Sequence, residues 1–220
     1  MAKIANTAFE VYVSNSKRND TQNITGKFGS FSGQTFTGDI CSAGFLCVKN
    51  SRTPNEGYEN PFSLVEGAFA AVDGLKNGNS WYMTQATGGT VTGAPGDHTG
   101  IYAANTYDVN RATAGDLVVN IPGKTLGLAI PANEYGDFTE LIVGEQYNFG
   151  AGNFSTLPTN LTTTPYATIS NGLWVASATA PTDGSVYAVV EDISKRFTEG
   201  VYDAGQKITL RIMRSVVATA

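Results

Sequence analysis

Short segments of alternating polarity recur along this chain of 220 residues, separated by clusters of Gly, Asn, Asp and Pro. The clearest is Lys207–Arg214, in which Ile208, Leu210 and Ile212 occupy every second position. Successive side chains of a β-strand point to opposite faces, so a period of two predicts a strand with one buried face. Many such strands between turn-forming residues are typical of β-sandwiches and β-barrels.

The strand pattern, enriched in Val, Ile, Thr, Tyr and Phe, extends over most of the chain. It is clearest in Phe9–Val13, Thr35–Cys41, Phe45–Lys49, Ser80–Gln85, Leu117–Ile121, Thr125–Ile130, Leu173–Ala178, Ser185–Glu191 and Lys207–Arg214. Helical periodicity is weak and 25 residues are glycine, so only Asn133–Val143 and Asp192–Phe197 are helix candidates. The predicted class is all-β: a sandwich or barrel-like domain, or two small β lobes with long loops, with at most one or two short helices.

Segments without alternation suggest the division into domains. Asn15–Gly33 is polar and spaced by glycines, so we expect residues 1–34 to form an N-terminal strand and an irregular arm. Residues 35–220 form the predicted β domain, and a split into two lobes near residue 110 or near residue 155 is an alternative. Phe28, Phe31 and Phe36 are the predicted interface residues, because this is the pattern of an arm that docks on a neighbouring subunit. An irregular edge strand is the other interpretation.

The charge pattern limits the partners. Fourteen Lys and Arg residues face 19 Asp and Glu residues, for a net charge of -5, and no basic cluster is present. Phosphate contacts require a concentrated positive patch, so we expect no nucleic-acid partner. No segment approaches the roughly 18 apolar residues of a membrane span, and none has the pattern of a secretory signal. We therefore expect no membrane partner and synthesis in a cytoplasm.

Two cysteines, Cys41 and Cys47, flank the predicted turn Ser42–Gly44. In a hairpin with a three-residue loop these thiols are diagonal instead of directly opposed. A disulfide needs Cα atoms within about 7 Å, which a diagonal placement satisfies poorly. The prediction is therefore two buried free thiols.

The sequence offers little for catalysis. The single histidine, His98, lies in the glycine-rich segment Gly93–Gly100 and is expected in an exposed loop. Metal sites and mechanisms that need two imidazoles are excluded, and neither a nucleophile elbow nor a phosphate-binding glycine motif occurs. Asn105–Asn110 carries oxygen ligands of the kind that calcium uses, but Asx turns are the preferred interpretation. We predict no enzymatic activity, no cofactor and no metal.

Carboxylates and tryptophans leave two further hypotheses open. Asp137, Glu140 and Glu145 are close in sequence, and a pair of carboxyl groups across an aromatic-lined cleft would support glycoside hydrolysis. Trp81 and Trp174, or exposed tyrosines, would instead stack on sugars in a carbohydrate-binding or adhesive module. Turn caps and core packing are the simpler roles of these residues.

Several segments together resemble the capsid-associated decoration, or cement, proteins of tailed bacteriophages. The segments are a short apolar strand near the N-terminus, Thr37–Ile40 leading into Gly44–Val48, Gly144–Tyr147, Ser170–Trp174 and Lys207–Ile212. The resemblance spans most of the chain, and none of these strings is diagnostic by itself.

The resemblance implies a virion structural protein, assembled in the host cytoplasm, that binds the outer capsid surface and stabilises contacts between capsomers. The implied partner is the major capsid protein, and the implied state is a homo-oligomer such as a trimer. Multivalent attachment would convert weak contacts into firm ones. Another virion role, as a tail, baseplate or major capsid component, is the first alternative. The adhesive module and the glycan hydrolase follow in that order.

Overall fold

The fold is known from a computed structural model, which describes residues 9–12, 23–33, 35–50, 80–91, 97–105, 129–198 and 201–216. The N-terminal strands are β1 (Phe9–Tyr12), β2 (Asn23–Ser32), β3 (Thr35–Gly38), β4 (Cys41–Ser42), β5 (Leu46–Lys49), β6 (Ser80–Gln85) and β7 (His98–Asn105). The C-terminal strands are β8 (Ala129–Ile130), β9 (Tyr135–Ile142), β10 (Gln146–Gly150), β11 (Phe154–Thr156), β12 (Tyr166–Ser170), β13 (Leu173–Ser177), β14 (Val186–Thr198) and β15 (Val201–Arg214). One 3-10 turn, η5 (Ala151–Asn153), precedes β11. The all-β prediction is confirmed.

Five strands form a closed barrel in the order β2, β6, β5, β7 and β9, because β9 pairs again with β2. The neighbouring strands are antiparallel except β2 and β6, which are parallel. A ring with an odd number of strands cannot alternate direction throughout, so one parallel pair is required. Strand β3 lies outside this ring and, among the described strands, pairs with the second half of β2.

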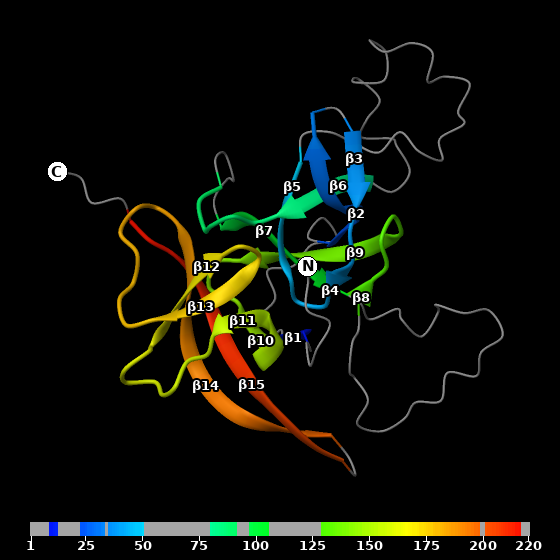
Figure 1. Ribbon diagram of the computed structural model, residues 1–220. Helices are drawn as coiled ribbons and strands as arrows, with labels where there is room; N and C mark the ends of the chain where they lie inside the picture. Colours follow the sequence, from blue (N-terminus) through cyan, green and yellow to red (C-terminus); the bar gives the residue numbers. More distant parts are fainter. Residues whose placement is uncertain are drawn as a thin grey trace.

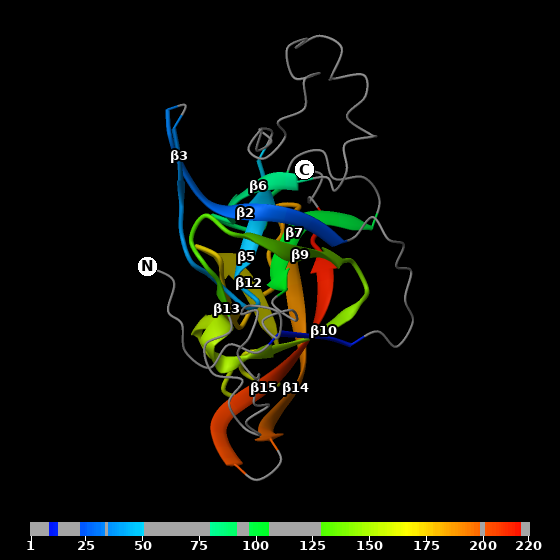
Figure 2. The ribbon, with the colours of Figure 1, turned by 90° about the vertical axis from the view of Figure 1, so that its right-hand side faces the viewer.

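A second sheet packs against the barrel, with the order β1, β10, β15, β14, β12, β13 and β11. Figure 1 shows the barrel strands at the upper right and this sheet at the lower left, and Figure 2 shows β14 and β15 extending away from the barrel. The pairing of β14 with β15 continues to Thr198 and Val201, with bulges after Val190 and Lys195. A two-residue pairing of β4 with β8 completes the described sheets.

The two layers have separate hydrophobic cores that share strands. The barrel interior holds Cys47, Tyr102 and Phe138, whereas Leu46 and Leu141 face the cluster shared with the seven-stranded sheet. Strands β5, β7 and β9 are therefore covered on both faces, and the apolar residues of these strands run without the alternation of a half-exposed strand. None of the helices in the described ranges is long and apolar enough to cross a membrane.

Neither of the two helix candidates is a helix. Asn133–Val143 contains strand β9, and Asp192–Phe197 lies within strand β14. In β9 the three-residue spacing of Phe138 and Leu141 resembles helical periodicity, but the two side chains enter different cores on opposite faces of one strand. The predicted strand Leu117–Ile121 and the alternative boundary near residue 110 lie outside the described residues.

The prediction of an irregular arm is wrong for Asn23–Ser32, which form β2. The glycine spacing that suggested irregularity reflects close packing. A Cβ atom at Gly26 would lie 2.6 Å from the carbonyl oxygen of Trp81 on β6, and one at Gly29 would lie 2.6 Å from the ring of Phe36 on β3. Glycine is thus required where β2 approaches its neighbours.

The predicted hairpin around Ser42–Gly44 is also not formed. Strand β4 pairs with β8, whereas β5 pairs with β6 and β7, so the strands that flank this turn do not pair with each other. Both cysteines are nevertheless buried and unbridged, as predicted. The turn instead packs toward the seven-stranded sheet, where the side-chain amide of Asn153 donates to the carbonyl of Ala43 at 2.7 Å.

Candidate functional site

The β2–β3 hairpin projects from the barrel and carries aromatic side chains. Strand β2 pairs with β6 and β9 up to Phe28, and its residues from Gly29 to Ser32 pair with β3. Ser32 pairs with Thr35 across a tight turn that begins at Gly33, whose φ of 60° lies in the left-handed region. Glycine adopts this conformation without the steric cost of a side chain. Both views show the hairpin leaving the barrel (Figures 1 and 2).

Three rings pack together around the pair of residues next to the turn-flanking pair of this hairpin. Phe31 and Phe36 are a cross-strand pair with centroids 5.2 Å apart. The ring centroid of Tyr82 on β6 lies 4.2 Å from that of Phe36 and 5.1 Å from that of Phe31. The planes of the Tyr82 and Phe31 rings are at 90° to each other. All three side chains are partly exposed. Edge-to-face packing of this kind holds the rings in a fixed arrangement at the surface.

The aromatic surface continues across the barrel. In the sheet, Lys27 lies between Tyr82 of β6 and Tyr135 of β9. Its ammonium is 4.6 Å from the centroid of the Tyr135 ring, a cation–π distance, and Tyr135 is 41% exposed. We call Phe31, Phe36, Tyr82 and Tyr135, arranged around Lys27, the aromatic face.

The hairpin part of the aromatic face is uncharged. No residue from 29 to 38 has an ionisable side chain. The positions that alternate with the two phenylalanines carry hydroxyl groups and are exposed, namely Ser30, Ser32, Thr35 and Thr37. Covering such a surface costs less hydration energy than covering charged groups, provided that the hydroxyl groups gain hydrogen-bond partners.

The predicted interface residues separate into two groups. Phe28 is 6% exposed and packs edge-on against Phe45 at 5.4 Å, so it belongs to the barrel core and not to the surface. Phe31 and Phe36 lie on the aromatic face. Sequence reasoning missed Tyr82 and Tyr135, since only the pairing of β2 with both β6 and β9 reveals that they flank Lys27.

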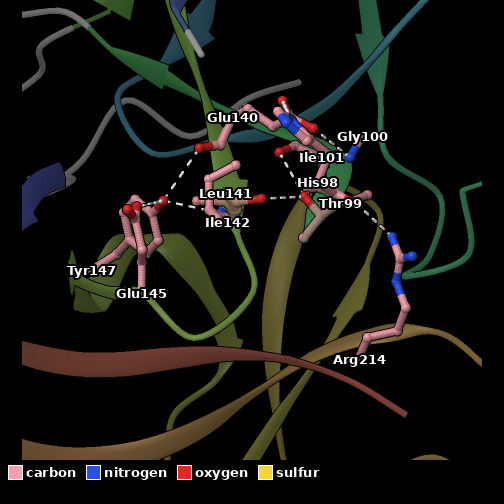
Figure 3. Close-up of polar contacts among 10 residues, drawn as sticks. All are labelled: His98, Thr99, Gly100, Ile101, Glu140, Leu141, Ile142, Glu145, Tyr147 and Arg214. Atoms are coloured by element: carbon pink, nitrogen blue, oxygen red, sulfur yellow. Dashed lines mark hydrogen bonds and ion pairs between the residues drawn. The ribbon is translucent and has the colours of Figure 1, made fainter. Parts of the chain in front are cut away.

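A second cluster joins the barrel to the seven-stranded sheet (Figure 3). Glu140 on β9 is 4% exposed, accepts a hydrogen bond from the backbone N–H of Gly100 at 2.8 Å, and lies 2.8 Å from Nδ1 of His98. Arg214 on β15 donates to the carbonyl of His98 at 2.7 Å. His98 is the first residue of strand β7, so it does not lie in the predicted loop.

The negative charge of Glu140 affects the pKa of a tyrosine inside the barrel. Burial raises the pKa of Tyr102 to about 12, and the neighbouring Glu140 carboxylate adds to the increase. Side chains two positions apart on a strand point to the same face. Tyr102 therefore points into the barrel with Ala104, and Glu140 points to the same side as Phe138. The carboxylate is therefore held in an interior position.

This cluster does not have the geometry of a nucleophilic site. A histidine oriented by a carboxylate can activate a hydroxyl within hydrogen-bond reach. The adjacent hydroxyl, that of Thr99, is fully buried and donates to the backbone carbonyl of Leu141 at 2.5 Å. The contacts of His98 and Glu140 thus fit a structural link between the two layers.

The carboxylates considered for glycoside hydrolysis do not converge. Asp137 is exposed and accepts a hydrogen bond from Thr25 at 3.2 Å, whereas Glu140 lies on the opposite face of the same strand. Glu145 accepts a hydrogen bond from the hydroxyl of Tyr147 at 2.7 Å. Among the described residues, no group of three or more His, Cys, Asp or Glu side chains is placed to hold a metal ion. The segment Asn105–Asn110 lies beyond the described residues except for its first residue.

The tryptophans do not form a sugar-stacking platform. Trp174 is fully buried and packs against Phe149 at 5.5 Å. Trp81 is partly buried, and the ammonium of Lys49 lies 4.0 Å from its ring centroid. A second pair of partly exposed rings, Tyr166 and Tyr187, lies on the seven-stranded sheet with centroids 6.0 Å apart.

No protein-family model, curated protein or solved structure matches this chain. What the chain does must accordingly be inferred from its own residues and geometry.

Proposed function

We propose that this chain is a non-enzymatic structural protein of a tailed-phage virion, a decoration protein that binds the outer capsid surface and stabilises contacts between capsomers. Its partner is the major capsid protein, and it acts as a small symmetric homo-oligomer such as a trimer. Assembly takes place in the host cytoplasm. The proposal starts from the resemblance in sequence and is supported by one feature of the fold.

That feature is the aromatic face with its uncharged hairpin. Partly exposed Phe31 and Phe36 stand on a projecting two-stranded element, which suits insertion against a neighbouring protein surface. Buried apolar area contributes about 25 cal/mol per Å², and aromatic residues are enriched among the side chains that dominate binding energy. Repetition of such a contact over a symmetric shell multiplies a modest affinity.

The ring orientations favour a protein partner over a polysaccharide. Sugar platforms present flat, roughly coplanar rings, whereas the interplanar angles here are 90° for Phe31 and Tyr82, 56° for Phe31 and Phe36, and 36° for Phe36 and Tyr82. A surface of tilted rings instead offers ridges and hollows that complement packed side chains. The hydroxyl-bearing positions around the rings add hydrogen-bonding groups without net charge.

The test mixes the purified chain with capsids of the encoding phage that lack decoration. Sedimentation and electron microscopy report binding, and release of DNA on heating reports stabilisation. We expect bound density on the outer capsid surface and a higher temperature of DNA release. The double variant Phe31→Ser/Phe36→Ser should bind at least tenfold more weakly, because two central apolar contacts are lost.

A matched control removes exposed apolar area elsewhere. Leu161 is 46% exposed and lies in the segment between β11 and β12, so Leu161→Ser should bind as the original chain does. Circular dichroism shows whether each variant is folded. Absence of capsid binding by the folded chain would refute the proposal, and retention by a cell-wall polysaccharide column would favour the adhesive module.

A further inference from the structure

The two cysteines lie in contact inside the barrel although they belong to different strand pairings. The Sγ atoms of Cys41 and Cys47 are 3.9 Å apart, and both residues have no exposed surface. Cys41 is on β4, which pairs with β8, and Cys47 is on β5, which pairs with β6 and β7. The diagonal hairpin geometry that argued against a disulfide is therefore absent.

The segment between the cysteines connects the barrel to the seven-stranded sheet. Ala43 accepts a hydrogen bond from the side chain of Asn153, and Leu46 donates its N–H to the carbonyl of Gly172 at 2.8 Å. Phe45 packs beside Gly172, so closely that a Cβ atom there would overlap its ring. A covalent link from Cys41 to Cys47 would close a ring around this contact segment.

We propose that Cys41 and Cys47 are a site of reversible disulfide formation, which locks the contact between the barrel and the seven-stranded sheet when the protein meets an oxidant. The two thiols together lose two protons and two electrons, and one S–S bond forms. With diamide as the oxidant, the first thiolate adds to the N=N bond. The second thiolate then attacks the first sulfur, breaks the S–N bond and releases the hydrazine.

Burial makes this site slow to react. Removal from water raises the pKa of the Cys41 thiol well above its usual value, and the hydrogen bond and charge of Cys47 add to the increase. The thiolate is the reactive form, so oxidation requires a brief opening that admits the oxidant. Strands β4 and β8 share only two pairs, Cys41 with Ile130 and Ser42 with Ala129, and such a short pairing opens at low cost in free energy.

The same site differs from an exposed redox sensor. Sensor cysteines are accessible and have low pKa values, whereas these thiols remain reduced while a reducing compartment surrounds the folded chain. After transfer to an oxidising medium the disulfide accumulates gradually, and burial in the core makes its reduction by dithiols slow as well. The inference goes beyond the proposed function and holds whether or not the chain binds a capsid.

The experiment uses the full-length chain, reduced and freed of reductant, then incubated with diamide under native conditions. Intact mass should show the loss of two hydrogen atoms, and peptide mapping should identify the Cys41–Cys47 link. The melting temperature should rise by about 5 °C, as expected for a short closed loop in a chain of this size, and should return after treatment with dithiothreitol. The rate should increase with pH, because the thiolate fraction increases.

Two single variants, Cys41→Ala and Cys47→Ala, serve as matched controls, since each keeps one thiol and cannot form the internal link. Diamide should leave their melting temperatures unchanged. If one variant fails to fold, the comparison of reduced and oxidised original chain still decides the question. Two alkylatable thiols remaining after prolonged oxidation, a link that forms only in urea, or a disulfide that leaves the melting temperature unchanged or lower would each overturn the inference.

Discussion

Nδ1 of His98 lies 2.8 Å from Oε2 of Glu140, and this contact pairs a partly exposed imidazole with a carboxylate that is almost wholly buried. A charge in the interior is tolerated only when hydrogen bonds replace its lost hydration. His98 and the backbone N–H of Gly100 provide them, one at each carboxylate oxygen. The alternation of β9 places the Glu140 carboxylate in the interior, and its hydrogen bond with His98 therefore contributes to the stability of the fold.

Replacement of Glu140 tests this contribution. Hydrogen bonds to charged groups contribute about 1.5 to 3 kcal/mol each to stability, so Glu140→Ala should lower the free energy of unfolding by about 3 kcal/mol. The matched control is Asp137→Ala on the same strand, where the side chain is exposed and the loss should be about 0.5 kcal/mol. Urea denaturation followed by circular dichroism measures both. Equal losses would show that Glu140 is not stabilised by its partners.

Ionisation of Tyr102 gives a prediction at high pH. Its pKa in the folded chain is raised to about 12 by burial and by Glu140, whereas an unfolded chain has the ordinary value near 10. The folded state therefore holds this proton more tightly, and the associated stability is present below about pH 10 and is lost as the pH rises toward 12. Absorbance titration of tyrosinate, compared between the original chain and Tyr102→Phe, should place the difference near pH 12. A difference centred near pH 10 would contradict the prediction.

Strands with one covered face were predictable from the sequence. Of the three strands covered on both faces, β5 was predicted as Phe45–Lys49, whereas β7 and β9 were not. Ser80–Gln85 has the predicted bounds, and the predicted Lys207–Arg214 is the C-terminal part of β15. In contrast, β7 was not among the predicted strands. Its first three residues fall in the glycine-rich segment Gly93–Gly100, and Ile101 to Ala104 are all buried and show no alternation. A strand between two cores lacks the period of two, and its own sequence does not distinguish it from a loop or a helix segment.

The candidate site was predictable only in part for a related reason. Phe31 and Phe36 were identified from composition, but the same reasoning included Phe28. The side chain of Phe28 is on the opposite face of β2 from that of Phe31 and is buried in the barrel core. Tyr82 and Tyr135 are far from the hairpin in sequence. Their place beside Lys27 depends on long-range pairing, which a local pattern does not contain.

Two glycines with similar backbone angles should respond differently to alanine. Gly172 has φ 75° and Gly144 has φ 89°, so each substitution incurs the strain of a left-handed residue, about 1 kcal/mol. A Cβ atom at Gly144 would meet nothing within 4 Å, whereas at Gly172 it would overlap the buried ring of Phe45. Gly172→Ala should therefore cost about 3 kcal/mol or more in total, measured by thermal unfolding. Comparable losses in the two variants would mean that Phe45 moves aside freely.

The contact between the barrel and the seven-stranded sheet can be tested at Asn153, which is 1% exposed. Its amide nitrogen donates to Ala43 and its amide oxygen accepts from the N–H of Gly150 at 3.2 Å. Asn153→Ala leaves a carbonyl and an N–H buried without these partners, so the free energy of unfolding should fall by about 2 to 3 kcal/mol.

Asn160→Ala provides the control for that substitution. The Asn160 oxygen accepts hydrogen bonds from the N–H groups of Thr162 and Thr163 in an exposed turn, at 2.9 and 2.7 Å. Water can replace a lost acceptor at the surface but not between the two layers, so this variant should lose about 1 kcal/mol. Denaturation curves of the two variants separate the interpretations. If the Asn160 variant were the less stable of the two, the hydrogen bond from Asn153 to Ala43 would not make the expected contribution to the contact between the barrel and the seven-stranded sheet.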